Sequence, residues 1–497
     1  MEQLPVSFLK RIRLFLWPIH AQEQSKFLPT FLIFFMLAYI YDMLRIIKSS
    51  IVVAESQVGA EIIPYLKVWA MIPGAFLLTG LAIKLSHKFN REKIFYIMLL
   101  FFIGFYSIFM LFIYPNRSSL ELTYISHFLD NSLPPGAMGF ASMIRHWHLS
   151  IFYVITELWG GILLSMLFWG FANEITSMEQ ASRFYPLFLL GANSAAIFAG
   201  ITSAYYADHS FNPNLPFGHT SWEQSLVFYL STAVLGGLII IGIFYWMHRY
   251  GDIYSQESAA KKRQQEEKVK LSLRDCCIYL ARSKHLMFIA LLVLSYNLVF
   301  NLSDILFENE LKFLYQDDTS SMARYKSHIT TLTGLLSVFI SLFVSGNILR
   351  RFGWKYAAYI TPITIGITCV IFFLFLLFGN YDWWRHILLS LGSDPILLTL
   401  FFGSVQVVFS RACKYTLFDT SKEIAFIPLS TQEKRHGKAA IDGVGSRLGK
   451  SLGSFLTQIL LLCFHSIGKA SPYIAGIIIC MLIIWFFAVR GLSEKLG

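Results

Sequence analysis

The chain has 497 residues, of which 55% are hydrophobic, 16% aromatic and only 14% charged, and its formal net charge is +11. Soluble domains carry about 25% charged residues, so this composition excludes an ordinary soluble globular protein and predicts a protein embedded in a lipid bilayer. The excess of positive charge suits an anionic small-molecule partner, and we expect no nucleic-acid partner.

The N-terminal stretch 1–26 is basic and amphipathic, and it begins "MEQLPVSFLKRIRLFLWPIH". No small-residue cleavage site follows it, which argues against a secretory signal peptide. We expect a short helix on the cytoplasmic surface of the membrane, anchored by Trp17.

Beyond this stretch the chain is dominated by long apolar runs. A membrane-spanning helix needs about 20 mostly apolar residues. Twelve candidate spans are predicted near 27–48, 62–84, 94–114, 149–171, 184–206, 226–247, 286–307, 328–350, 355–378, 393–413, 439–464 and 471–490. We therefore expect an all-α polytopic membrane protein with two six-helix bundles, 27–247 and 286–490, a basic cytoplasmic linker at 248–285 and a cytoplasmic tail at 491–497.

Basic turns set the expected orientation. "KLSHKFNREKIF" (84–95) and "NILRRFGWKYA" (347–357) occupy matching positions of the two halves, after the second and the eighth span. Because lysine and arginine favour the cytoplasmic side, both termini are predicted to be cytoplasmic. The loop 172–183 disagrees, with two glutamates against one arginine. Two pseudo-equivalent bundles are typical of major-facilitator-like carriers, which bind substrate between the bundles near mid-membrane.

Metal and redox chemistry have little support. The six cysteines show no paired spacing beyond the adjacent Cys276 and Cys277, and we interpret them as small core residues. His146 and His148 flank Trp147 without carboxylates at ligand spacing. We therefore expect no cofactor and no metal, and we disfavour the competing hypothesis, a membrane enzyme acting on a phosphorylated lipid.

Charged residues inside predicted spans are more informative, because each costs about 2.5–3.5 kcal/mol at a helix centre. Arg45 and Lys48 lie three residues apart on one helix face, Lys67 opens the second span, Glu157 lies in the fourth and Asp304 in the seventh. The three cations could instead extend to the membrane interface, and Glu157 could form a purely structural ion pair. Otherwise these residues bind substrate or couple ions.

The densest polar tract is 410–453, and it contains "GSRLGKS" (445–451). Its end resembles a phosphate-binding loop, but Val444 occupies the place of the first glycine and no strand precedes it, so a nucleotide-hydrolysing loop is excluded. Small residues surround the later cations, and they allow either close helix packing or room for a ligand. The cations that we expect to face a cavity for a polyanion are Lys438, Arg447 and Lys450.

At this point the tract shows a family resemblance. "KYTLFDTSKEIAFIPL", "GKAAID" and "LGKSLG", together with "GAEIIPYLKVW" (59–69) and "ELWGGILLSMLFWGFANEIT" (157–176), resemble the signature of the nucleotide (ATP/ADP) translocases of obligate intracellular bacteria and plastid envelopes. The resemblance implies a carrier that imports host ATP against ADP, in the inner membrane of an intracellular bacterium. It also implies functional charges at Lys67, Glu157, Asp304 and either Lys438 or Lys450.

Two segments depart from the family pattern. Family members commonly read R-D-T-K-D-T after the first span, where this chain reads "RIIKSS" without the acids. They commonly read N-L-V-E-V-T-W-K in the seventh span, where this chain reads "NLSDILFE", with Asp304 for Glu and Glu308 for Lys. Two alternatives therefore stay open: proton-coupled import of nucleoside triphosphates, and exchange of another nucleotide, such as NAD, for ADP.

The expected mechanism is alternating access with electrostatic compensation of the nucleotide phosphates by the cations named above. Glu157 and Asp304 would pair with those cations in the empty carrier, or one of them would titrate and couple a proton, since burial raises a carboxyl pKa. Asn297 and Asn301, with Tyr296, are the candidates for holding base or ribose.

Overall fold

The computed structural model describes residues 18–250 and 283–496, apart from 380, 391, 431–432, 434–436, 438–440 and 442–445. Every regular element in this part of the chain is a helix. Residues 1–17 of the predicted surface helix, most of the predicted linker and Lys438 lie outside the described residues.

The first half supplies six long helical crossings. They are α2 (Gln24–Glu55); α3 (Ile62–Tyr65) continued by η3 (Leu66–Ala70) and α4 (Met71–Ser86); α5 (Arg91–Ile108) with η4 (Phe109–Ile113); α9 (Trp147–Trp159) with η6 (Gly160–Phe168) and α10 (Trp169–Ile175); α11 (Met178–Ala207); and α12 (Ser221–Tyr250). The connections contain short helices: η1 (Ala21–Glu23), η2 (Gly59–Glu61), α6 (Arg117–Leu120), α7 (Thr123–Ser132), η5 (Pro135–Ala137) and α8 (Met138–Arg145).

The second half repeats this plan. It contains α15 (Lys284–Tyr315); α16 (Thr319–Phe339), η7 (Ile340–Ser345) and α17 (Gly346–Phe378); α18 (Asp382–Ser390); α19 (Pro395–Cys413), η8 (Lys414–Phe418) and α20 (Asp419–Ala425); α22 (Ser446–Phe464); and α23 (Ile467–Leu496). Inside α17 the chain turns at Gly353, whose φ of 80° is non-helical and is a value that glycine adopts readily.

Ten helices among the described residues are long and apolar enough to cross a membrane. One of them runs over 60 residues, Thr319–Phe378, and the turn at Gly353 divides it into two crossings. A shorter apolar helix, Ser451–Phe464, lies within α22. These elements account for all twelve predicted spans, and the prediction of an all-α polytopic fold is confirmed.

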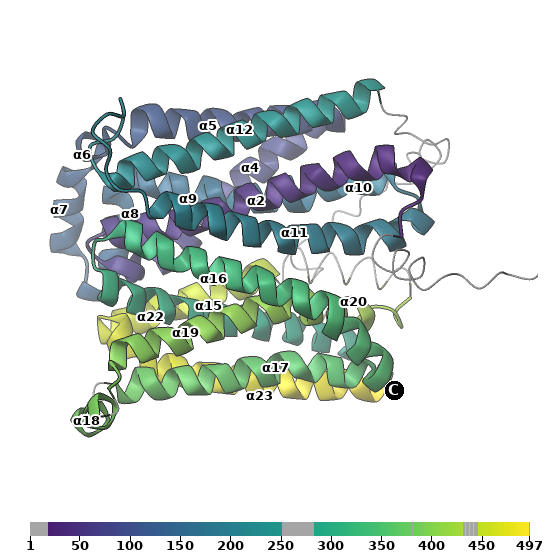
Figure 1. Cartoon of the computed structure of the whole chain (residues 1–497). Coiled ribbons are helices and arrows are strands. Elements are labelled where there is room, and N and C mark those ends of the chain that lie inside the picture. Colours follow the sequence, from purple (N-terminus) through teal and green to yellow (C-terminus); the bar gives the residue numbers. More distant parts are fainter. Residues whose placement is uncertain are drawn as a thin grey trace, which may run out of the picture.

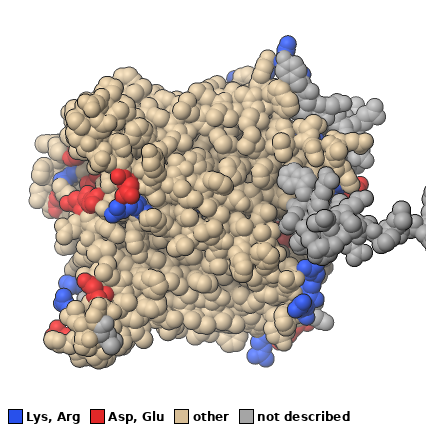
Figure 2. All heavy atoms as spheres, viewed as in Figure 1, with Lys and Arg blue, Asp and Glu red and all other residues tan. Residues whose placement is uncertain are grey.

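The two ends of the bundle differ. The beginning of α2 and the end of α23 lie at one end, here called the terminal face, while α7 and α18 lie at the opposite end, the distal face (Figure 1). Figure 2 shows lysine, arginine, aspartate and glutamate gathered at these two ends, with a broad uncharged belt between them. Such a belt matches the hydrocarbon core of a bilayer.

The halves touch most closely where α11 meets α16, and glycines permit this approach. A Cβ atom added to Gly200 of α11 would lie 2.2 Å from Thr331 Oγ1 of α16, and one added to Gly334 of α16 would lie 2.7 Å from Ile197 of α11. Small residues at helix contacts let backbones pack tightly inside a membrane. The two bundles are therefore in direct backbone contact along this pair.

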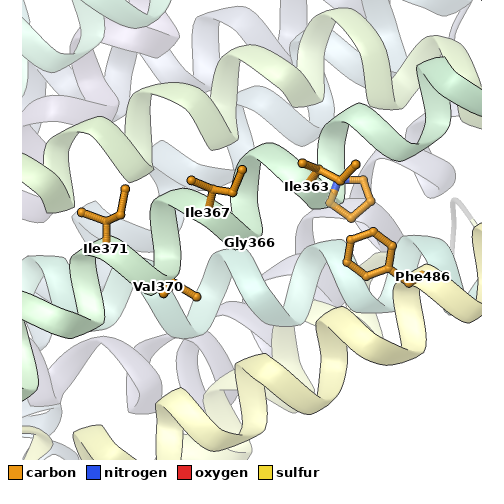
Figure 3. Close-up of a pocket in the computed structure, with 7 residues that line it drawn as sticks. Ile363, Gly366, Ile367, Val370, Ile371 and Phe486 are labelled. Atoms are coloured by element: carbon orange, nitrogen blue, oxygen red, sulfur yellow. The ribbon is translucent and has the colours of Figure 1, made fainter.

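An apolar groove of about 380 Å³ lies on the outer surface of the second half, between α17 and α23 (Figure 3). Its lining residues are Pro362, Ile363, Gly366, Ile367, Val370, Ile371 and Phe486. Ile367 and Val370 are more than half exposed, as expected for side chains that face lipid. This groove offers a phosphate group neither a cation nor a hydrogen-bond donor, so the substrate site has to be sought between the halves.

Candidate substrate site

Arg45 and Lys48 both point from α2 into the protein. The Arg45 guanidinium lies 3.0 Å from Asp42 of the same helix. The Lys48 ammonium contacts Glu157 of α9 and lies 4.5 Å from the centre of the Tyr153 ring. Only 6% of the Lys48 side chain is exposed, so the alternative in which Lys48 extends to the membrane interface is wrong in this conformation.

The predicted carboxylates each contact a cation. Glu157 lies one turn before the π-helical segment η6, a kind of irregularity that is frequent at functional sites. Asp304 of α15 accepts a hydrogen bond from Arg411 of α19 at 3.1 Å, and the Arg411 guanidinium lies 5.6 Å from the centre of the Phe300 ring. Glu157 and Asp304 therefore have structural partners in this state, which is what an empty carrier with self-neutralised charges requires.

Tyrosines connect the charges of the two halves. Tyr153 of α9 is within electrostatic reach of Glu157 of its own half and of Asp304 and Glu308 of the other half. Tyr415 of η8 is within electrostatic reach of Arg45 across the interface. Charged residues of both bundles thus lie close together in one central region, which is where major-facilitator-like carriers bind substrate.

Six charged residues of this cluster were not among the predicted site residues. Lys414 lies 3.4 Å from Asp419 in η8 and α20, and Asp42 is within electrostatic reach of Arg411. A second buried pair, at 2.5 Å, joins Glu308 to Lys326 of α16. The missed residues are Asp42, Glu308, Lys326, Arg411, Lys414 and Asp419. Of these, Glu308 was noted as a departure from the family pattern.

Solvent exposure increases through the cluster from one face toward the other. The side chains of Lys326 and Glu308 are 8% and 7% exposed, that of Arg411 is 17% exposed, and that of Asp419 is 41% exposed. Asp419 begins α20, which lies at the terminal face (Figure 1). The cluster is therefore sealed toward its Lys326 end and wetter toward the terminal face.

Lys67 joins the first half to two helices of the second. It lies in the π-helical segment η3, and its ammonium donates a hydrogen bond to Asn301 Oδ1 of α15. The Asn301 amide nitrogen donates in turn to Ser454 Oγ of α22 at 3.0 Å. The predicted residues Lys67 and Asn301 are thus brought together, although 234 positions separate them.

The other predicted base or ribose contacts are placed differently. The Asn297 amide donates to the carbonyl of Val293 one turn earlier in α15, at 2.8 Å. Tyr296 is only 1% exposed, and its ring packs against Phe418 and Trp485 in the core of the second half. In this conformation Tyr296 has no open surface toward a ligand, while the role of Asn297 stays a prediction.

The tract 445–451 forms no loop where its backbone is described. Residues from Ser446 onward belong to α22, so Gly449, Lys450 and Ser451 are part of a helix. Arg447 and Lys450 are in the first turns of this helix. A Cβ atom at Gly449 would lie 2.9 Å from Asn297 Cβ, and one at Gly453 would lie 2.8 Å from Asn301 Nδ2. At these two positions the small residues serve close helix packing.

The histidine pair has one partner that the sequence spacing did not indicate. His146 Nδ1 lies 3.6 Å from a carboxylate oxygen of Glu121, and the rings of His146 and His148 are 6.2 Å apart. The fold of the loop before α9 brings Glu121 there from 25 positions away. Within the described part of the chain, no three His, Cys, Asp or Glu side chains are grouped as metal ligands.

Taken together, the cluster contains cations that a polyanion could use and carboxylates that neutralise them meanwhile. Burying an unpaired charge is costly, whereas a paired one is tolerated. Phosphate oxygens can replace carboxylate oxygens as partners of lysine and arginine, with similar charge-assisted hydrogen bonds. The arrangement can therefore exchange internal ion pairs for contacts with an anionic ligand without leaving a buried charge unpaired.

Replacing Lys67 by alanine is expected to lower transport of an anionic substrate at least tenfold, because a charge-assisted hydrogen bond is worth about 1.5–3 kcal/mol. Initial uptake rates at equal amounts of protein in the membrane measure this effect. Lys84→Ala, an exposed lysine at the end of α4, is the matched control and should transport normally. Uptake by Lys67→Ala at the parent rate would show that Lys67 has no part in the site.

The sequence matches the family model described as TLC ATP/ADP transporter over residues 3–496. It is 37% identical over 487 residues to ADP,ATP carrier protein 1 of Chlamydia trachomatis, covering 97% of this chain and 91% of that protein. It is 34% identical over 471 residues to the chloroplastic ADP,ATP carrier protein 1 of Arabidopsis thaliana, covering 95% of this chain and 74% of that protein.

Solved structures share the fold. A bacterial homologue of the iron transporter ferroportin in an inward-facing state aligns with a TM-score of 0.55 at 13% identity, covering 95% of this chain and 98% of that one. A partially occluded inward-open xylose transporter from E. coli aligns with a TM-score of 0.54 at 12% identity, covering 96% and 98%. At such low identity these structures support the two-bundle transporter architecture alone.

Proposed function

The chain belongs to the TLC ATP/ADP transporter family, and we propose that it exchanges ATP for ADP across a membrane by alternating access. The observation that carries the proposal is the cluster of paired charges contributed by both bundles. Relatives from Chlamydia and from plastids that match almost the whole chain carry ADP,ATP carrier names. In this proposal the nucleotide crosses the membrane without being chemically changed, so no catalytic residue is assigned.

In the empty carrier the cations are held by carboxylates: Arg45 by Asp42, Lys48 by Glu157, and Arg411 by Asp304. An entering triphosphate takes over these cations, and the carboxylates turn toward water or toward other donors. Lys67, Arg447, Lys450 and Lys438 are proposed as further phosphate partners, and Asn297 and Asn301 as contacts to base or ribose. When the nucleotide leaves, the internal ion pairs form again. Both the loaded and the empty carrier therefore avoid unpaired buried charge.

We assign the terminal face to the cytoplasm, because the basic turns predicted to be cytoplasmic, such as that at Arg350 and Arg351, lie at the ends of crossings on that side. With that orientation both termini are cytoplasmic. The host membrane is proposed to be the inner membrane of an intracellular bacterium, and the net flux to be ATP inward against ADP outward.

Two departures in the sequence keep a second transport mode in view. Asp304 replaces the glutamate common in the family, and Glu308 replaces a lysine in the same helix. A carboxylate in a buried site can couple a proton when its protonation differs between states. Proton-coupled import of nucleoside triphosphates, or exchange of NAD for ADP, is the alternative for this site.

Uptake of labelled ATP into liposomes that contain the protein and internal ADP separates these modes. Exchange predicts uptake that requires internal ADP and is indifferent to a proton uncoupler. Uptake that proceeds without internal ADP and is abolished by the uncoupler would replace exchange with proton coupling. If ATP is not taken up, NAD is offered in the same assay, and NAD-dependent release of ADP would identify the other exchange.

A further inference from the structure

A buried ion pair lies at the sealed end of the charged cluster. Lys326 Nζ of α16 is 2.5 Å from Glu308 Oε2 of α15, with side-chain exposures of 8% and 7%. Both helices belong to the second half. Desolvation makes a buried ion pair weak evidence for stability in itself, so the pair invites a functional reading.

The same ammonium also reaches across to the first half. Lys326 Nζ donates a hydrogen bond to Ser49 Oγ of α2 at 3.0 Å. Ser49 directly follows Lys48, whose ammonium contacts Glu157. The two buried ion pairs are therefore linked through one turn of α2, and the link passes from one bundle to the other.

Other contacts between the halves lie on the distal side of this link. Lys312 of α15 donates to the carbonyl of Ala54 of α2 at 3.0 Å. The Glu61 carboxylate accepts from the backbone nitrogen of Ile467 at 3.3 Å. A Cβ atom on Gly136 would lie 2.0 Å from the carbonyl oxygen of Leu461. The distal ends of the two bundles are therefore packed against each other in this conformation.

At the terminal ends, the described hydrogen bonds join residues of a single half. Arg183 donates to Glu23 at 2.7 Å within the first half, and the ring of His285 contacts the carbonyl of Ala425 at 2.7 Å within the second half. Together with the exposure of Asp419, this pattern describes a carrier closed at the distal face. The hydrogen bond from Lys326 to Ser49 joins the halves at the residue next to Lys48 of the Lys48–Glu157 pair.

We propose that Lys326, Glu308 and Ser49 form a latch that holds the distal face closed and releases when the halves rock apart. The proposal rests on the alternating access of the proposed function. When the halves separate, Lys326 loses its hydrogen bond to Ser49 but keeps its ion pair, because Glu308 stays beside it within the second half. The ammonium that crosses the interface is thus never left as an unpaired buried charge, in the closed or in the open state.

The position of Ser49 also couples the latch to the substrate site. A phosphate that draws Lys48 away from Glu157 shifts the turn of α2 that carries Ser49. That shift weakens the hydrogen bond from Lys326, so substrate binding favours opening of the distal face. The latch residues therefore act through α2 on the closure of the distal face and need no contact with the nucleotide.

Accessibility of the distal face tests the latch without any nucleotide. Ala60 of η2 is 1% exposed in the closed state, and η2 packs against α15 of the other half. In the Ala60→Cys chain, the rate of labelling by a membrane-impermeant maleimide applied from the distal side reports opening, measured against the chain without this cysteine. Ser49→Ala should raise that rate about tenfold, because it removes a hydrogen bond from a charged donor.

The neighbouring serine provides the control. Ser50 is the next residue of α2 and is fully buried, whereas Ser49 is partly buried. The Ser50 hydroxyl donates to the carbonyl of Ile46 within α2 at 2.9 Å. Ser50→Ala should therefore label at the rate of the Ala60→Cys parent. Equal rates for Ser49→Ala and the parent would overturn the latch, and so would equal acceleration by Ser49→Ala and Ser50→Ala.

Reversing the charges tests the pair itself. Glu308→Lys alone places two cations together and should speed labelling. Glu308→Lys with Lys326→Glu restores an ion pair and leaves a carboxylate to which the Ser49 hydroxyl can donate, so labelling should return to within about twofold of the parent. Fast labelling of this folded double variant would contradict the latch. Because no nucleotide is present, a failure here leaves the proposed exchange untouched, and a failure of exchange leaves this result standing.

Discussion

Glu157→Gln is expected to lower the maximal rate of ATP/ADP exchange about 100-fold, without raising KM. Glutamine keeps the shape of glutamate but cannot neutralise Lys48, whose side chain is only 6% exposed. Removing one partner of a buried ion pair costs about 3–5 kcal/mol. When the nucleotide leaves this variant, Lys48 no longer regains the Glu157 carboxylate, so release becomes the slow step.

Initial exchange rates over a range of ATP concentrations, in liposomes with equal amounts of protein, separate the two kinetic parameters. Glu494→Gln is the control, because its pair with Arg490 is exposed and such surface pairs contribute little. If Glu157→Gln has a normal maximal rate and a higher KM, Glu157 does not act by receiving Lys48 in the empty carrier.

Arg411→Ala is expected to raise the KM for ATP about 10–100-fold, because a hydrogen bond to a charged group contributes about 1.5–3 kcal/mol. Arg411 pairs with Asp304 at 3.1 Å and is within electrostatic reach of Asp42 on the opposite half. It is therefore placed to hold phosphate where both bundles meet. Arg411→Lys keeps the charge but loses the planar fork of donors. Its KM should lie between those of the parent and of Arg411→Ala.

The same kinetic measurement checks this prediction, with two further variants. Arg385→Ala removes an exposed arginine of α18 and should leave KM unchanged. Arg411→Ala with Asp304→Asn removes the cation without leaving a carboxylate unpaired. If KM returns to the parent value in that double variant, Arg411 serves only to neutralise Asp304, and its assignment as a phosphate partner fails.

Much of the fold could be predicted because apolar length is a direct requirement of the bilayer. Glu157 and Asp304 could be singled out for the same reason, since a charge in an apolar run is conspicuous. Lys48, which contacts Glu157, is among the cations expected to pair with it, but Arg411, the partner of Asp304, could not be predicted. Arg411 and Asp304 are 107 positions apart, and only the packing of α19 on α15 brings them together.

Other residues were missed because a span boundary was misplaced. The predicted tenth span ends at 413 and so excludes Lys414, whereas the helical crossing continues through η8 and α20 to Ala425. Lys326 precedes the predicted span 328–350, whereas α16 already begins at Thr319. A hydropathy pattern ends a predicted span at a lysine, because burying a lone charge in the bilayer is costly. A buried partner such as Glu308 removes that cost, but the pairing leaves no local signal in the sequence.

The central claim is that internal ion pairs replace the nucleotide in the empty carrier and that a loaded carrier is required for exchange. Release of labelled ADP from loaded liposomes tests it most directly, in medium with and without external ATP. The account predicts slow release into nucleotide-free medium and rapid release, unaffected by a proton uncoupler, once ATP is added. Equally rapid release in both media would show that ADP leaves without a counter-substrate and would contradict the account.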